Sequence, residues 1–149
     1  MIEASVLWQY SLFDGLEKEQ IDSILPLMEH ETFEAGTEII VEGGHNDKVR
    51  FILDGHVAVI KGGVILMEHK EGTVFGEMEV LDVQPVEATV KAITTTEVMT
   101  LSIDALGQIY ETDLKTYSFI LMNLARDISR RLRRMAVKMT DESPPTEWS

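Results

Sequence analysis

The stretch that decides the fold is FGEMEVLDVQPVEATV, which runs from Phe75 to Val90. A segment rich in β-branched residues ends at Phe75, and Gly76 allows a sharp exit from this strand because glycine tolerates backbone angles that other residues avoid. A short helix should follow, then a loop that contains Pro85, and then a new strand near Ala88. Because a helix N-terminus exposes unpaired N–H groups and carries partial positive charge, a unit of this kind is suited to holding an anion.

This stretch resembles the phosphate-binding cassette of the cyclic nucleotide-binding domain family. The family pattern reads Phe-Gly-Glu, a few apolar or small residues, a short loop, and then Pro-Arg-small-Ala followed by Thr or Ser. The matching residues are Phe75, Gly76, Glu77, Met78, Val80, Leu81, Pro85, Ala88, Thr89 and Val90. A second segment, from Ile40 to Val57, also resembles the family, with framing glycines at Gly43 and Gly55. The resemblance covers Leu12 to Met139 and implies a β-roll with helices before and after it.

Two positions depart from the family pattern where the ligand would bind. In the family an arginine binds the cyclic phosphate, and Val86 takes its place here. Glu87 replaces the small residue that follows this arginine in the family pattern. The family glutamate that accepts a hydrogen bond from the ribose hydroxyl falls on Glu77, which could instead be a helix-start residue favoured by the helix dipole. Losing a charge-assisted hydrogen bond costs ~1.5–3 kcal/mol, and a carboxylate ~6 Å from a phosphate costs ~2–3 kcal/mol at an effective dielectric of ~20. Together these costs predict a cyclic nucleotide affinity lowered by roughly three to four orders of magnitude.

The residues predicted to form the ligand site are Phe75, Gly76, Glu77, Met78, Val86, Glu87, Ala88 and Thr89. We expect no cofactor and no metal; the ligand class left open is a cyclic nucleotide or another small anion. If the backbone cradle is intact, the double change Val86→Arg with Glu87→Ala should restore cyclic AMP binding by offering the phosphate a fork of donors. If Val86 packs into the core, the site is collapsed or empty. Tight cyclic nucleotide binding by the unmodified chain would instead mean that another cation, Arg126 or Arg131, has taken the role of the family arginine.

The middle of the chain predicts an antiparallel β-roll of the double-stranded β-helix or jelly-roll kind. Short β-branched runs separated by glycines are typical of this architecture. The expected strands are Glu31–Phe33, Glu38–Val41, Val49–Leu53, His56–Ile60, Val64–His69, Ala88–Ile93 and Glu97–Ser102. Gly62 and Gly63 lie between two of these runs and predict a two-residue hairpin. With helices on either side, the fold class is α+β.

Helices are expected before and after the roll. A short one is expected over Met1–Tyr10, with its apolar side formed by Val6, Leu7 and Tyr10. Helical spacing of apolar residues predicts a second over Glu17–Met28, which Pro26 should end or kink. Asp104 is a candidate N-cap for a helix that starts near Ala105.

The longest helix is expected from Leu114 to Met139. Apolar residues recur along it at three- and four-residue spacing, namely Tyr117, Leu121, Leu124, Ile128, Leu132 and Met135. This stripe would be a large exposed patch on a monomer, so we predict a homodimer packed along it. Leu124→Glu should then dissociate the dimer and leave each roll folded. The family resemblance likewise implies a dimerising helix here, beside the ligand pocket.

Composition is typical of one globular domain. The chain has 149 residues, of which 44% are apolar, enough for a core. We assign residues 1–140 to the domain and 141–149 to a flexible tail rich in acidic residues and proline. The absence of cysteine excludes disulfides and thiolate metal sites. No apolar run reaches the ~18 residues of a membrane helix and no signal peptide is recognisable, which predicts a cytoplasmic protein without membrane contact.

The charge distribution argues against sequence-specific nucleic-acid binding. A net charge of −13 opposes association with a polyanion. Basic residues do gather in the long helix, at Arg126, Arg130, Arg131, Arg133, Arg134 and Lys138. On a helix they spread over several faces, which favours a solvated surface over a nucleic-acid patch. Too few residues follow Met139 for the helix-turn-helix of the DNA-binding relatives. We therefore expect output through a partner protein or through the dimer itself.

The predicted function is regulatory and not enzymatic. The histidines at positions 30, 45, 56 and 69 lack the close spacing of metal ligands. No nucleophile elbow, P-loop or dinucleotide fingerprint is found, which opposes a small jelly-roll enzyme. The resemblance implies a regulatory or sensor domain that signals by ligand binding and dimerisation, with an altered cassette. The alternative is a ligand-free dimeric scaffold for protein contacts.

Overall fold

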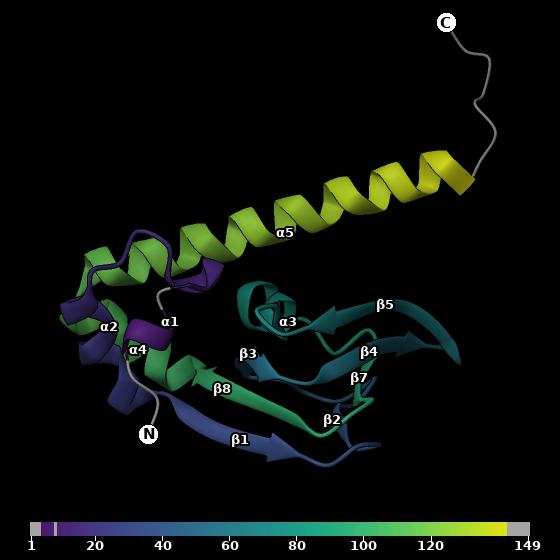
Figure 1. Cartoon of the computed structure of the whole chain (residues 1–149), viewed down its shortest axis with the longest axis horizontal. Coiled ribbons are helices and arrows are strands. Elements are labelled where there is room, and N and C mark those ends of the chain that lie inside the picture. Colours follow the sequence, from purple (N-terminus) through teal and green to yellow (C-terminus); the bar gives the residue numbers. More distant parts are fainter. Residues whose placement is uncertain (1–3, 8, 143–149) are drawn as a thin grey trace, which may run out of the picture.

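Two antiparallel sheets of four strands each form a roll at the centre of the chain (Figure 1). The computed structural model describes residues 4–7 and 9–142. The first sheet has the order β1 (Glu29–Phe33), β8 (Thr96–Ser102), β3 (Lys48–Asp54) and β6 (Val74–Phe75). The second has the order β2 (Glu38–Ile40), β7 (Thr89–Ala92), β4 (His56–Lys61) and β5 (Val64–Lys70). The predicted β-roll and α+β class are therefore confirmed.

The hairpin between β4 and β5 shows how glycine sets the register of the second sheet. Lys61 pairs with Val64, so Gly62 and Gly63 alone make the turn. Their φ angles are 57° and 77°, and a two-residue turn of type I′ requires positive φ at both positions. The turn predicted from the two glycines is confirmed. β5 is an edge strand of this sheet, and two of its residues line the candidate ligand site described below.

The N-terminal helices are shorter than the sequence predicts. They are α1 (Ala4–Leu7), η1 (Ser11–Phe13), α2 (Lys18–Ile24) and η2 (Leu25–Leu27). Pro26 lies in the tighter turn of η2, where α2 ends, so its predicted effect is confirmed. Leu7 is buried as expected, but Val6 is exposed, because the buried side of α1 is formed by Ala4 and Leu7. Part of the helix predicted over Met1–Tyr10 lies outside the described residues.

Two helices follow the roll, α4 (Ile103–Thr112) and α5 (Leu114–Glu142). The prediction that Asp104 caps α4 is wrong. Ser102 is the N-cap, since its side-chain oxygen accepts a hydrogen bond from the backbone N–H of Ala105 at 3.0 Å. Asp104 lies in the first turn instead, where a carboxylate is also favourable. Residues 143–149, most of the predicted tail, lie outside the description. None of the helices within residues 4–7 and 9–142 is both long and apolar enough to span a membrane.

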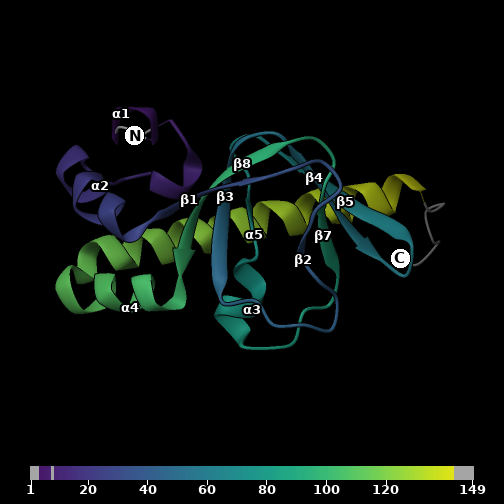
Figure 2. The ribbon, with the colours of Figure 1, turned by 90° about the horizontal axis from the view of Figure 1, so that it is seen from below.

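The first half of α5 packs into the core of its own chain. Figure 2 shows that α5 begins beside α4 and then continues past the roll. Leu124 is only 1% exposed and lies in the same core cluster as Phe13 and Phe51. Tyr117 and Leu121 pack against that cluster as well. The expected exposed stripe is therefore wrong over this half of the helix.

Candidate ligand-binding site

The predicted strand–turn–helix unit is present at the cassette. β6 ends at Phe75, Gly76 has a φ of 83°, and α3 follows over Glu77–Asp82. A Cβ atom added at Gly76 would lie 2.7 Å from the backbone oxygen of Lys48. Both the positive φ and this close approach restrict the position to glycine. The fold therefore fixes the backbone of the cassette against β3.

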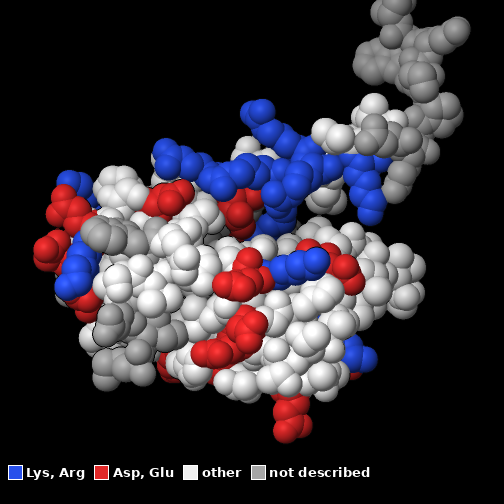
Figure 3. Space-filling model, viewed as in Figure 1, with Lys and Arg blue, Asp and Glu red and all other residues white. Residues whose placement is uncertain are grey.

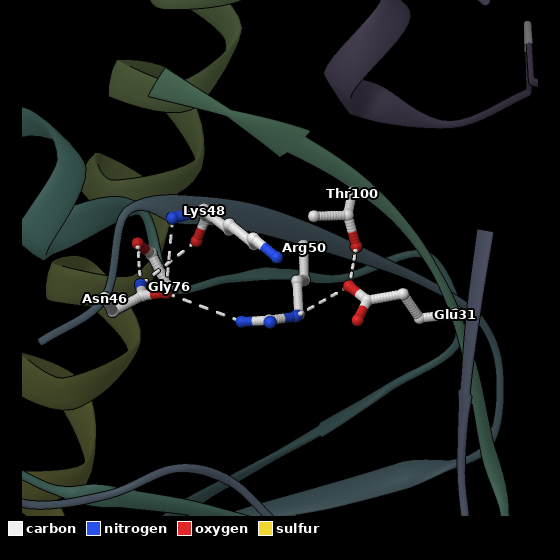
Figure 4. Close-up of polar contacts among 6 residues, drawn as sticks. All are labelled: Glu31, Asn46, Lys48, Arg50, Gly76 and Thr100. Carbon is white, nitrogen blue, oxygen red and sulfur yellow. Dashed lines mark hydrogen bonds and ion pairs between the residues drawn. The ribbon is translucent and has the colours of Figure 1, made fainter. Parts of the chain in front are cut away.

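Asn46 ties the cassette to the start of β3 (Figure 4). Its side-chain N–H groups donate to the backbone oxygens of Gly76 at 2.8 Å and Lys48 at 3.0 Å. They also donate to the carboxylate of Glu79 at 3.2 Å. Its side-chain oxygen accepts from the backbone N–H of Lys48 at 3.2 Å and from Arg50 at 3.4 Å. This bridging role was missed from the sequence, because the groups that it joins are distant along the chain.

A small cavity lies between the cassette, β5 and α5. Its volume is about 110 Å³, whereas pockets for drug-sized ligands are usually ~300–1,000 Å³. Six predicted residues line it, namely Phe75, Gly76, Glu77, Met78, Glu87 and Ala88. The cavity also includes Met67 and His69 from β5 and Arg131 from α5. Sequence analysis named Arg131 only as an alternative cation, and it missed both β5 residues.

Glu77 is buried at the start of α3 and forms an ion pair with Arg131. The residue is 1% exposed, and one guanidinium N–H of Arg131 donates to its Oε1. A second N–H group donates to the backbone oxygen of Val74 at 2.6 Å and to Asp127 at 2.7 Å. Burial raises the pKa of Glu77, and the Arg131 charge opposes this shift. Arg131 thus connects α5 to the candidate ligand site by hydrogen bonds. Arg126, the other cation considered from the sequence, lies exposed on α5.

The side chain of Val86 is apolar and packs in the core of the roll, so it presents no polar group to the cavity. It is 5% exposed and packs in a cluster with Ile52, Phe75 and Val98. Its backbone pairs with the loop before β3. Gly43 donates to its oxygen at 2.9 Å, and its N–H donates to the oxygen of Gly44 at 3.1 Å. This finding agrees with the alternative in which Val86 packs.

Glu87 is on the surface and has a cation of its own. Its side chain is 73% exposed and accepts a hydrogen bond from Lys61 at 3.0 Å. Solvent and Lys61 both weaken the repulsion that Glu87 would exert on an anion in the cavity. Thr89 turns away from the cavity, and its hydroxyl oxygen accepts from the backbone N–H of Glu42 at 3.0 Å. The cassette loop therefore contributes no cation to the cavity.

His69 faces the same cavity from β5 and is kept neutral. It is 6% exposed. Burial, together with the nearby charge of Arg131, lowers its pKa from 6.5 to about 4. An uncharged imidazole is able both to donate and to accept a hydrogen bond. Figure 3 shows that the Lys and Arg side chains on this face gather along α5, above a roll that carries acidic groups. Positive charge therefore reaches the cavity from α5.

Comparisons with known proteins agree with this geometry. The sequence profile described as "Cyclic nucleotide-binding domain" matches residues 30–113. The cAMP-dependent protein kinase regulatory subunit of Eremothecium gossypii is 40% identical over 75 residues, which are 50% of this chain but only 16% of that protein. This chain thus spans a small part of that relative's length.

Solved structures share the fold over most of the chain. A cyclic nucleotide-binding domain from Methylobacillus flagellatus superimposes with a TM-score of 0.84 at 23% identity, over 97% of this chain and 84% of that one. The regulatory subunit of a cAMP-independent protein kinase A from Trypanosoma brucei has a TM-score of 0.63 at 28% identity, over 70% and 38% of the two chains. The matched profile covers more than half of this sequence and includes the cassette, and the chain therefore belongs to the cyclic nucleotide-binding domain family.

Proposed function

We propose that this chain is a regulatory domain whose ligand site controls the position of α5. The observation that carries the proposal is that one cavity is bounded both by the cassette and by Arg131 of α5. A change in the cavity therefore acts on the long helix without any intermediate element. The domain works by binding and not by catalysis, as the resemblance to regulatory subunits suggests. Its output passes to a partner protein or through the dimer, and not through sequence-specific nucleic-acid binding.

The ligand preference of this site is altered relative to the family pattern. Val86 is apolar and buried, and Glu87 is an exposed carboxylate paired with Lys61, so the cassette loop offers no cation to a cyclic phosphate. The cavity of about 110 Å³ is also small for a nucleotide. We propose that cyclic nucleotides bind weakly, and that a small anionic ligand is the class to which the site is still open.

The structure changes the design of the variant that should restore binding. Val86→Arg would place a guanidinium in the core of the roll, where burying a charge is costly. Glu87→Arg is the better change, because position 87 is exposed and lines the cavity. This change removes a carboxylate and adds a guanidinium, whose N–H groups can donate two parallel hydrogen bonds to a phosphate.

Calorimetry with cyclic AMP tests this proposal. Glu87→Arg should bind cyclic AMP at least tenfold more tightly than the wild type, since ~1.4 kcal/mol is sufficient for that factor. Glu34→Arg has the same change in net charge at an exposed position away from the cavity, and it should leave binding unchanged. Equal binding by all three proteins would refute a role of the cassette loop in ligand affinity.

We also propose that the domain dimerises through α5, along a line of residues that shares only Leu132 with the predicted stripe. A seam of exposed residues with alternating four- and three-residue spacing runs along the helix, comprising Ser118, Met122, Ala125, Ser129, Leu132, Ala136 and Met139. This is the a/d period by which one helix packs against a copy of itself. A surface hollow of about 530 Å³ lies beside it, lined by Leu114, Phe119, Met122 and others. A second copy of the helix is the occupant that fits this period.

Sedimentation of paired variants tests the seam. Leu132 is 61% exposed and Leu124 is 1% exposed. Leu132→Glu should convert a dimer to a monomer with an unchanged fold. Leu124→Glu should instead unfold the helical end of the molecule, in contrast to the expectation from sequence. A wild-type protein that stays monomeric at micromolar concentration would refute dimerisation.

A ligand-free dimeric scaffold is the second candidate function. The observation that favours it is the ion pair between Arg131 and Glu77, which already closes the site with groups of the chain itself. Mass spectrometry of small molecules that copurify with the native protein separates the two candidates. A stoichiometric copurified ligand supports the sensor, and its absence together with a stable dimer supports the scaffold.

A further inference from the structure

Arg131 is the point at which the basic segment of α5 enters the ligand site. Its side chain is 13% exposed, whereas Arg130, Arg133 and Arg134 are all exposed. It contacts three groups at once, namely the Glu77 carboxylate on α3, the Val74 oxygen on β6, and Asp127 one turn earlier on α5. A single side chain therefore joins α5 to the strand that leads into the cassette and to the short helix that follows it.

The groups that Arg131 occupies are the ones that a ligand of this cavity would need. Glu77 is the buried carboxylate of the cavity, and its Oε1 is already engaged. Arg131 itself lines the cavity. Without Arg131, Glu77 would be a buried carboxylate beside Asp127, with no cation to offset either charge. The closed arrangement is therefore favoured as long as no ligand is present.

We propose that Arg131 is a resident occupant of the ligand site, which holds α5 closed on the cassette and thereby suppresses cyclic nucleotide binding. A ligand that uses Glu77 binds only to the fraction of molecules in which Arg131 has withdrawn. Its apparent dissociation constant is raised by the inverse of that fraction. The suppression rests on the proposed function, whereas the closure is a property of the ligand-free chain and is measured separately.

Hydrogen exchange of the ligand-free protein measures the closure. Arg131→Ala should speed the exchange of amides at the C-terminal end of α5 and in α3 by at least tenfold. Arg133→Ala is the matched control, because it removes an exposed arginine of the same helix that does not line the cavity. Both variants replace arginine with alanine, so they change helix propensity equally. Arg131→Lys keeps the cation and should restore part of the protection. If Arg131→Ala exchanges no faster than Arg133→Ala, the closure is refuted.

Calorimetry with cyclic AMP on the same variants measures the suppression. Arg131→Ala should bind at least fivefold more tightly than the wild type, and Arg133→Ala should bind as tightly as the wild type. Weaker binding by Arg131→Ala would overturn the proposal, since Arg131 would then be the cation that holds the ligand. If exchange accelerates but neither the wild type nor Arg131→Ala binds cyclic AMP, the closure stands, while the suppression and the cyclic nucleotide part of the proposed function both fail.

Discussion

Replacing His69 with glutamine should remove a pH dependence of folding that originates in the ligand cavity. The imidazole is 6% exposed, and Arg131, Asp127 and Arg134 of α5 act on it electrostatically. Burial and Arg131 lower its pKa from 6.5 to about 4. In the unfolded chain His69 takes up a proton at about pH 6.5, while the folded chain resists protonation until about pH 4. Stability is therefore complete above the unfolded pKa and is lost as the pH falls through this window.

The size of the effect follows from the two pKa values. At about pH 5 the unfolded state binds almost one proton at this residue, and the folded state binds almost none. The resulting loss of unfolding free energy is about 2 kcal/mol relative to neutral pH. Glu77 and Glu79 act in the opposite direction, because burial raises the pKa of each and their protonated forms stabilise the fold as the pH falls. The comparison between two chains that share both glutamates isolates His69.

Urea unfolding of the wild type and of His69→Gln between about pH 7 and pH 5 is the assay. A shift in stability that is the same at every pH is not diagnostic, and only the change of the difference with pH is. The difference between the two chains should shrink or reverse by about 2 kcal/mol on acidification, in favour of the glutamine variant. A difference that stays flat would refute the account, since His69 would then titrate alike in the folded and unfolded states.

The remaining predictions concern stability. Leu124→Ala should cost ~2–5 kcal/mol in urea unfolding because the side chain is buried, whereas Leu132→Ala should cost less than ~0.5 kcal/mol at concentrations where the chain is monomeric; similar losses would contradict the assignment of faces on α5. Val83 has a φ of 58° and is 80% exposed, so Val83→Gly should raise the unfolding free energy by ~1 kcal/mol through relief of backbone strain; a loss would show that its side chain contributes more than this strain. Ser102→Ala should lower stability by ~1 kcal/mol and Asp104→Ala by less, a ranking that thermal unfolding checks.

The sequence predicted most of the roll because its signals are local. Gly62 and Gly63 set a turn that needs positive φ at both positions, and Pro26 ends a helix for lack of an N–H group. The N-cap of α4 was assigned wrongly because Ser102 and Asp104 are both good capping residues. Because β8 ends at Ser102 and α4 begins at Ile103, Ser102 takes the N-cap position.

Side-chain direction and distant contacts were not predictable in the same way. The three- and four-residue spacing around Leu124 marks an apolar face, but it does not tell whether that face meets its own core or a second chain. Val86 was predicted to be a cassette residue, yet only the fold shows that its side chain packs in the core of the roll. Arg131 is 54 residues from Glu77 in the sequence, and His69 belongs to another strand, so no local pattern connects them.

Titration of the wild-type protein with cyclic AMP in a calorimeter tests the central claim most directly. That claim is that the cassette keeps its backbone but is closed by Arg131 and has no cation on its own loop. The account predicts no saturable heat in the micromolar range. Saturable micromolar binding with one site per chain would contradict it, because the closed pair of Arg131 and Glu77 would then be no obstacle to the ligand.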